Sequence, residues 1–233
     1  MMCVSNEIGN HLVGNARWIG ILLADLLEEA GVQKGAEQIM GESVDGFTAG
    51  FPVETALDGR DAMLVVGMNG HTLPAEHGYP ARLVVPGLYG YVSATKWLKE
   101  IRLTTWDEQG FWIPRGWSRL GPIKTTSRID VPHNSEELVA GTVPIAGVAW
   151  APTKGIERVE VQVDDGPWQA ATLGPTASDD TWVQWWLPWE ATAGQHQIRV
   201  RAVDGDGRTQ TAEIAAPAPD GATGLHTIDV TVG

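Results

Sequence analysis

The second half of the chain repeats a short alternation of apolar and polar residues, and this pattern restricts the fold more than any other feature. In residues 157–163, Val159, Val161 and Val163 alternate with polar side chains. A period of two is that of a β-strand with one buried face. Runs of the same kind occupy residues 142–150, 181–186, 197–203 and 226–232. Turn residues separate these runs and no helical pattern intervenes, so the sequence predicts an all-β sandwich of immunoglobulin type.

The first half has mixed patterns. Residues 19–30 carry leucines at spacings of three and four, which predicts an amphipathic helix that ends at Gly31. Short apolar runs at 62–66 and 82–85 are typical of buried strands, and Asn69-Gly70 between them indicates a turn. We therefore expect an α+β chain with a mixed α/β domain over 1–124 and the sandwich over 125–233.

Charge and composition exclude several classes of protein. The chain carries 16 basic and 29 acidic side chains, a net charge of −13, which argues against a nucleic-acid binder. No apolar run reaches the roughly 18–20 residues of a membrane span. The single cysteine, Cys3, excludes an internal disulfide and a multi-cysteine metal cluster. The chain as written has no export signal and would be cytoplasmic, but a preceding segment could carry such a signal, so we make no prediction of its location.

Basic residues gather between 96 and 124, within this acidic chain. Such a stretch indicates either a local anion site or a solvated strand and loop with ordinary lysines. In the second half, the segment from Asp204 to Gly207 resembles part of a calcium loop but lacks the remaining ligands, so we expect a hairpin turn. Trp150, Trp168 and Trp182 are expected in the core or rim of the sandwich.

Several motifs occur together in one order along the chain. They are Cys3-Val-Ser-Asn, Asn15-Ala-Arg-Trp-Ile-Gly, Met68-Asn-Gly, Leu73-Pro, His77-Gly-Tyr-Pro-Ala-Arg-Leu-Val-Val-Pro-Gly and Lys96-Trp-Leu. Together they resemble the sulfite-oxidase-type molybdopterin-dependent oxidoreductases. The second half is similar to the immunoglobulin-like dimerisation domain that follows the cofactor domain in this family. The resemblance covers nearly the whole chain.

The resemblance assigns a role to each candidate site residue. Cys3 matches the cysteine that ligates molybdenum, a role that suits a soft thiolate; by itself, a lone cysteine is more often a small buried hydrophobe. Asp45 corresponds to an aspartate that contacts the pterin, although it also reads as a turn residue before Gly46. His77 and Arg82 match cofactor-holding residues, while His77 taken alone is a structural loop histidine.

The loop after Gly87 is the expected phosphate end of the cofactor site. The resemblance implies that Ser93, Thr95 and Lys96 contribute there, with an uncertainty of one position within 93–96 because the loop is one residue longer than the family pattern. The implied cofactor is molybdenum–molybdopterin.

The chain also departs from the family. In the segment 110–117, which resembles the substrate funnel and includes Arg115, Trp117 stands where sulfite oxidases carry a tyrosine. The Trp-rich strand 181–186 lacks the basic residue expected for a sulfite enzyme, which argues against sulfite as substrate. Only Met1 and Met2 precede Cys3, so we expect the chain to correspond to the latter part of a family protein, with its cofactor domain amino-terminally incomplete.

Two functions remain open at this stage. The first is oxidoreduction or oxygen-atom transfer at a mononuclear molybdenum centre with Cys3 as its protein ligand. Haem, flavin and nicotinamide fingerprints are absent from the sequence, so electrons would pass to a separate acceptor. The alternative is a non-catalytic member that acts as a dimerisation or interaction module. Under both readings we expect a homodimer formed through the carboxy-terminal domain.

Overall fold

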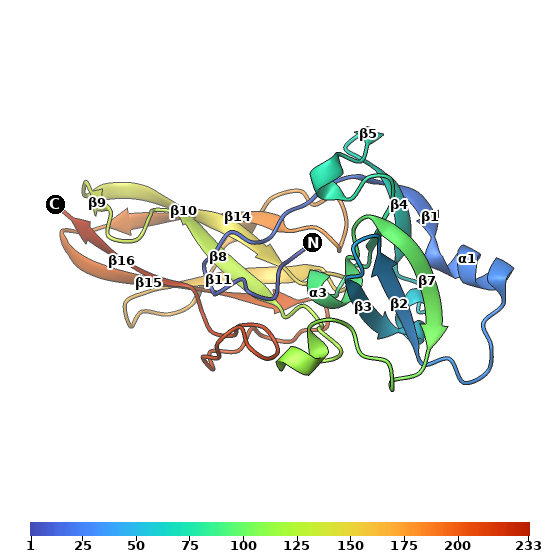
Figure 1. Ribbon diagram of the computed structural model, residues 1–233. Helices are drawn as coiled ribbons and strands as arrows, with labels where there is room; N and C mark the ends of the chain where they lie inside the picture. Colours follow the sequence, from blue (N-terminus) through green and yellow to red (C-terminus); the bar gives the residue numbers. More distant parts are fainter. The chain divides into compact units, whose positions relative to one another are not determined.

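The computed structural model describes residues 1–233, which divide into two compact units (Figure 1). The first unit comprises residues 1–5, 12–123 and 218–220. The second comprises residues 6–11, 124–217 and 221–233. Both are rich in β-structure, and helices are few and short. None of the helices has the length and apolar character needed to cross a membrane.

The first unit contains two small sheets. One has the order β1-β4-β5, with β6 also paired to β4; the other has the order β3-β2-β7. The elements of this unit are β1 (Trp18–Leu22), α1 (Leu23–Ala30), β2 (Gln38–Ser43), β3 (Thr48–Pro52), α2 (Val53–Leu57), β4 (Met63–Met68), β5 (His71–Thr72), the 3₁₀ turn η1 (Ala75–His77), β6 (Arg82–Val84), α3 (Gly90–Ser93), β7 (Leu98–Thr104) and η2 (Ile113–Arg115). Leu23, Ile39, Phe51 and Leu83 are fully or almost fully buried in its main core, which therefore joins α1 to strands of both sheets.

The predicted helix over 19–30 is correct only in its second part. Residues 23–30 form α1, and Gly31 ends it with φ 76° and an N–H donated to the Leu27 carbonyl. Residues 19–22 instead belong to β1, which pairs antiparallel with β4. A Cβ at Gly20 would lie 2.1 Å from the Leu64 carbonyl oxygen, so the strand depends on glycine for its close approach to β4.

The predicted turn at Asn69-Gly70 joins β4 to β5. Both residues have positive φ, 52° and 85°, the conformation that a tight type I′ hairpin requires. The apolar runs on either side form β4 and β6, as their lengths and flanking turns predicted.

The second unit contains two sheets that share one core. Their strand orders are β13-β14-β10-β8 and β12-β11-β15-β16-β9. The strands are β8 (Thr126–Val131), β9 (Glu137–Leu138), β10 (Gly141–Trp150), β11 (Ile156–Val163), β12 (Gln169–Ala170), β13 (Thr172–Leu173), β14 (Val183–Ala191), β15 (Gly194–Asp204) and β16 (Thr227–Val232). Ile145 and Trp185 from one sheet pack with Val159, Ile198 and Ile228 from the other. The two inner faces therefore enclose a common core.

Each alternating run of the sequence forms a strand of this unit. Among the tryptophans, Trp185 is the fully buried core residue and Trp150 is also buried, whereas Trp168 is half-buried with the Arg201 guanidinium 4.1 Å from its ring centre. The segment after Asp204 is a hairpin turn in which Asp204 Oδ1 accepts hydrogen bonds from the N–H groups of Asp206 and Arg208. The side chain that resembled a calcium ligand thus stabilises the turn.

Candidate active site

An open cavity of about 780 Å³ lies within the first unit. Its wall includes Cys3, Asp45, His77, Arg82 and Lys96, which come from four separate parts of the sequence. The remaining lining residues are mainly apolar or aromatic: Met1, Met2, Leu12, Val13, Phe47, Tyr91, Trp97 and Trp112. A cavity of this size with a few converging polar groups is typical of a ligand site.

The thiol of Cys3 is exposed at the cavity wall, and the backbone around it is fixed. The Cys3 N–H donates to the Leu12 carbonyl at 2.9 Å, and Met2 pairs antiparallel with Val13. The Gly90 N–H, at the start of α3, donates to the Met2 carbonyl at 3.1 Å. Main-chain bonds therefore hold the segment that carries Cys3 while its side chain stays accessible.

Arg82 is a buried guanidinium whose hydrogen bonds all go to backbone carbonyls. Its side chain belongs to β6, the residue is 4% exposed, and it donates to the carbonyls of His77, Leu83 and Ala94. Burial lowers the pKa of Arg82 to about 10, so the group is still cationic at neutral pH. A buried cation that lacks a carboxylate partner is costly, and an anion in the cavity would offset that cost.

Asp45 lies in the turn between β2 and β3 and is exposed to the cavity. The Phe47 N–H donates to Asp45 Oδ1 at 3.0 Å, and this bond holds the pKa of Asp45 below its usual range. The carboxylate is therefore ionised near neutral pH and acts as a hydrogen-bond acceptor. Close by in the sequence, the buried Ser43 also lines the cavity, and its side chain contributes to the lowered pKa of Asp45.

The cationic end of the cavity is built on the segment from η1 to Lys96. His77 ends η1 and is exposed, and Gly78 follows it with φ 110°. Lys96 Nζ donates to the Glu76 carbonyl at 2.9 Å and lies 4.3 Å from the centre of the Trp97 ring. Three cationic or potentially cationic side chains, His77, Arg82 and Lys96, therefore line one cavity with the acidic Asp45 and Glu76.

Ser93 and Thr95, predicted with Lys96 at the phosphate end, do not line the cavity. Ser93 Oγ donates to the Tyr89 carbonyl at 3.0 Å, a bond from the end of α3 back to the residue before it. The Thr95 hydroxyl is buried against β2, where a Cβ at Gly41 would meet it at 2.8 Å. Of the three residues, only Lys96 reaches the cavity wall.

The two weaker funnel candidates also lie outside the cavity wall. The Arg115 guanidinium is 3.6 Å from the Phe111 ring centre and donates to the Phe111 carbonyl. Trp117 packs with Trp112 and Tyr91, at centroid distances of 6.4 and 5.7 Å. Trp112 is the member of this segment that lines the cavity, and it also contacts Phe111, which in turn contacts Phe47.

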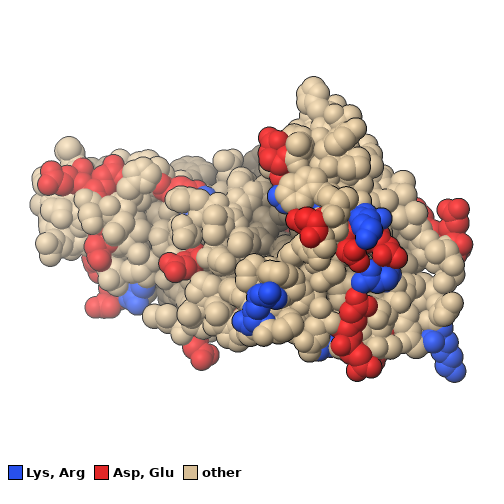
Figure 2. All heavy atoms as spheres, viewed as in Figure 1, with Lys and Arg blue, Asp and Glu red and all other residues tan.

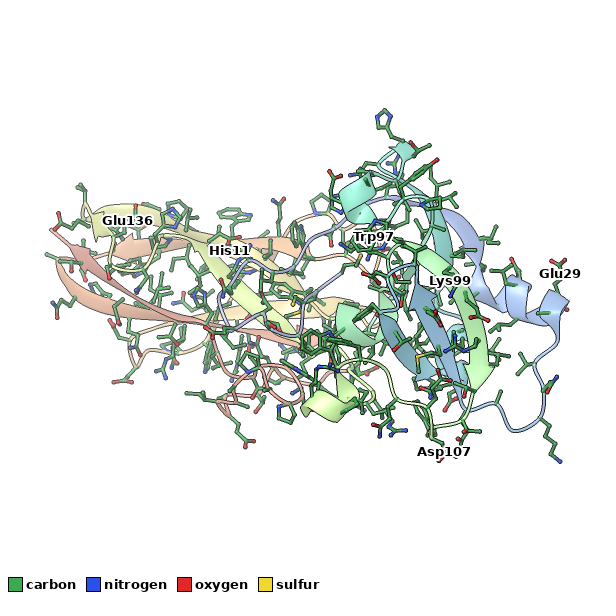
Figure 3. The ribbon with its side chains drawn as sticks, in the orientation of Figure 1. His11, Glu29, Trp97, Lys99, Asp107 and Glu136 are labelled. Atoms are coloured by element: carbon green, nitrogen blue, oxygen red, sulfur yellow. The ribbon has the colours of Figure 1, made fainter.

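Part of the basic stretch is neutralised on the outer strand β7. Arg102 forms ion pairs with Glu42, Glu100 and Glu108, and Lys99 pairs with Glu42. Blue and red groups lie side by side over this sheet in Figure 2, and Lys99 is labelled in Figure 3. For these two residues the solvated-strand interpretation is correct, while Lys96, at the start of the stretch, lies at the cavity.

Sequence reasoning missed Ser43, Phe47, Glu76 and Trp97 as parts of the cavity wall. Phe47 and Ser43 flank Asp45 within two residues, and Glu76 and Trp97 adjoin His77 and Lys96. The sequence signal that could have identified these four residues is that each lies within two positions of a predicted site residue.

The donor set fits a cofactor that carries both a phosphate and a hydrogen-bonding ring system. The buried Arg82 and the ammonium of Lys96 are suited to phosphate. The ionised Asp45 and the neighbouring Ser43 hydroxyl are suited to ring N–H and amino groups. The Cys3 thiol is suited to a soft transition metal.

Comparisons with known proteins agree with this chemistry. Residues 1–112 match the family described as oxidoreductase molybdopterin binding domain. Mitochondrial sulfite oxidase of Homo sapiens is 29% identical over 239 residues, covering 88% of this chain and 44% of that protein. Sulfite oxidase of Arabidopsis thaliana is 31% identical over 258 residues, covering 92% and 62%. The chain thus spans about half the length of these curated relatives.

A solved structure also resembles the whole chain. The sulfane dehydrogenase SoxCD from Paracoccus pantotrophus has a TM-score of 0.79 and 27% sequence identity, covering 97% of this chain and 66% of that chain. The fold is therefore similar to that of the sulfite oxidase group, and the cofactor implied by the family is molybdenum–molybdopterin. Residues 1–112 thus match the molybdopterin-binding oxidoreductase family, and the chain as a whole resembles the sulfite-oxidase-type molybdopterin-dependent oxidoreductases.

Proposed function

We propose that this chain binds molybdenum–molybdopterin in the cavity of its first unit and acts as an oxidoreductase, with Cys3 as the protein ligand to a mononuclear molybdenum. The carrying observation is that Cys3, Asp45, His77, Arg82 and Lys96 line one cavity although up to 93 positions separate them in the sequence. The cofactor supplies the redox or oxygen-atom-transfer chemistry, which side chains alone do not provide. Electrons pass to a separate acceptor.

The cationic residues hold the phosphate end of the cofactor in this proposal. Arg82 offers a planar fork of donors from a buried position, and Lys96 adds a second positive charge. Charge-assisted hydrogen bonds of this kind contribute about 1.5–3 kcal/mol each. Arg82 therefore contributes chiefly to cofactor affinity, while Lys96 and His77 orient the group.

Asp45 accepts hydrogen bonds from the pterin ring in this proposal. Because the pKa of Asp45 is lowered, its carboxylate is ionised near neutral pH. The hydrogen bond from the Phe47 N–H orients the carboxylate. Cys3 would supply the thiolate ligand to the metal, and main-chain hydrogen bonds fix the segment that carries it. The protein thus determines the orientation and access of the group.

The departures from the family pattern argue against sulfite as the substrate. Sulfite is a small dianion that needs fixed positive partners. Trp117 offers no phenolic proton where sulfite oxidases carry a tyrosine, and no basic residue occurs in residues 181–186. Arg115 is already bonded to the Phe111 carbonyl and stacked on that ring. Aromatic rings, among them Trp112 and Phe47, form part of the cavity wall.

The second unit is proposed to be an immunoglobulin-like dimerisation domain. Val131, Ala146 and Trp186 form one cross-strand row over β8, β10 and β14. Val131 and Trp186 are 40% and 49% exposed, so the row offers an apolar, uncharged patch on a unit with a net negative charge. Two like copies meet with least repulsion on such a patch, and a two-fold contact uses it twice.

The same patch also supports the alternative function, an interaction module without catalysis. Metal analysis separates the two. The chain purified from cells that synthesise molybdopterin should contain close to one molybdenum per chain. Metal-free protein from such cells would reject the oxidoreductase proposal and favour the module.

A further inference from the structure

Trp97 has a backbone conformation that is unusual for a large side chain. Its φ is 50°, in the left-handed region that mostly glycine and asparagine adopt. The residue follows Lys96 directly and is half-buried in the cavity wall. Residues in this conformation persist only where surrounding contacts hold them, and they concentrate at ligand sites.

The contacts of Trp97 belong to a series on the turn η1, which carries His77. Trp97 Nε1 donates to the Ala75 carbonyl at 2.7 Å, and Lys96 Nζ donates to the Glu76 carbonyl at 2.9 Å. Arg82 Nη1 donates to the His77 carbonyl at 3.0 Å. Three consecutive carbonyls are thus bonded by three different cavity side chains.

The backbone of Trp97 extends this series by one residue. Its N–H donates to the Gly78 carbonyl at 3.3 Å. At Gly78 a Cβ would lie 3.0 Å from Lys96 Cβ and 3.2 Å from Arg82 Cβ, so the turn and the cationic segment are in close contact. The N–H and the indole of Trp97 thus both donate to the same turn.

The indole is the one neutral donor among the three side chains. An anion in the cavity competes with backbone carbonyls for Lys96 and Arg82, because charge-assisted bonds are stronger than bonds to neutral acceptors. It does not compete in this way for the uncharged indole N–H. When Arg82 and Lys96 exchange their bonds to the η1 carbonyls for bonds to an anion, Trp97 is the one of these three side chains that still holds η1. Its ring also keeps Lys96 Nζ close, at 4.3 Å.

We propose that Trp97 is a positioning residue that fixes the turn bearing His77 and holds the Lys96 ammonium over the cavity. This inference depends on the proposed function for the assignment of His77 and Lys96 to the cofactor. Trp97 is labelled in Figure 3, within the first unit.

The test replaces the indole with a ring that lacks the N–H. In Trp97→Phe, the amides of His77, Gly78 and Tyr79 report on the turn, since they donate to the carbonyls of residues 74 and 75. In the cofactor-free full chain, hydrogen exchange at these three amides should become about tenfold faster, the effect of one lost hydrogen bond. Molybdenum per chain from molybdopterin-competent cells should fall severalfold.

The matched control is Trp106→Phe, a half-buried tryptophan of the same unit that packs on Arg119 outside the cavity. It should leave both readouts at their wild-type values. If Trp97→Phe leaves either the exchange or the molybdenum content unchanged, the inference is overturned. Faster exchange throughout the first unit, with a large fall in melting temperature, also overturns it, because Trp97 is then an ordinary packing residue.

An Arg82→Met variant separates this inference from the proposed function. Full molybdenum content in Arg82→Met counts against the proposed cofactor site itself. Loss of molybdenum in Arg82→Met but not in Trp97→Phe counts only against the role of Trp97. The exchange measurement needs no cofactor, so it tests the turn in every case.

Discussion

His196 and Asp164 form a hydrogen-bonded pair in the second unit, with 2.8 Å between Nδ1 and Oδ2. The other ring nitrogen of His196 is 2.8 Å from the Thr192 carbonyl oxygen. Both partners are acceptors, so the ring satisfies both only as an imidazolium. The bond to Asp164 is the main cause that raises the pKa of His196. Burial acts to raise the pKa of Asp164, but the bonds from His196 and the Gln197 N–H lower it overall.

The pair therefore predicts a pH-dependent contribution to the unfolding free energy. Because the folded pKa of His196 is raised, its contribution is fully present below the unfolded value near 6.5 and is lost as pH rises through the folded pKa. Asp164 is half exposed, so we expect less than about 1 kcal/mol. Urea unfolding of wild type and His196→Gln between pH 5.5 and 8.5 measures this difference.

The difference between the two proteins should shrink as the pH rises. His226 has the opposite effect, because burial lowers its pKa and its contribution is lost on acidification. It is present in both proteins and cancels in the comparison. A difference that is constant across this range would contradict a protonated His196.

Replacement of Gly20 by alanine should destabilise the first unit. The added Cβ would meet the Leu64 carbonyl oxygen at 2.1 Å and Val65 Cα at 2.8 Å, so β1 must move away from β4. Overpacking of this kind costs about 1–3 kcal/mol. The control is Gly14→Ala, where a Cβ meets nothing within 4 Å. Equal unfolding midpoints for the two variants would show that β1 tolerates the displacement.

The same strand illustrates what the sequence could predict. Helical spacing identified residues 23–30 correctly, since that signal is local. It was wrong for residues 19–22 because the partner strand β4 lies more than forty positions away and outweighs the local pattern. The strand β2 was not predicted for a different reason. Five of its six residues are buried, on both faces, so it shows no alternation of apolar and polar residues.

For the cavity, too, the sequence predicted some features and could not predict others. The motifs named Cys3, Asp45, His77, Arg82 and Lys96, and each of them lies on the cavity wall. The bond from the Trp97 indole to the Ala75 carbonyl joins residues 22 positions apart through a backbone acceptor. Every residue type presents a carbonyl, so no sequence pattern indicates such a bond.

Removal of the Cys3 thiol should affect the metal and leave the fold intact. The side chain is exposed, so Cys3→Ser should keep the wild-type melting temperature of the metal-free chain. If Cys3 ligates molybdenum, the metal content should fall at least about tenfold, and the sulfur-to-metal absorption should disappear. Elemental analysis and visible absorption measure both. An unchanged absorption spectrum would exclude Cys3 as the ligand.

Replacement of Arg82 by methionine should separate cofactor binding from stability. The guanidinium is buried without a carboxylate partner, and an apolar side chain of similar length removes an unpaired buried charge. The lost bonds to the His77 and Ala94 carbonyls oppose this gain, so the cofactor-free variant should melt close to the wild-type temperature. Its molybdenum content should fall tenfold or more, as expected for about 1.5–3 kcal/mol. Calorimetry and metal analysis provide the two values. A strongly lowered melting temperature with full metal content would identify Arg82 as structural.

The exposed indole of Trp186 should be central to self-association. It lies between Thr172 of β13 and Ala146 of β10, and the row continues to Val131 of β8, so three apolar side chains follow one another across the sheet. Loss of a central tryptophan from an interface typically costs at least about 2 kcal/mol, which corresponds to roughly 30-fold in dissociation constant. Trp186→Ser should therefore shift the full chain from dimer to monomer in sedimentation equilibrium. Ile214→Ser is the matched control, because Ile214 is an apolar residue that is 89% exposed and outside the row. Added salt should strengthen the wild-type dimer, since it screens the repulsion between two acidic units. A wild-type monomer at high micromolar concentration, or equal dimerisation of the two variants, would reject this surface as the contact.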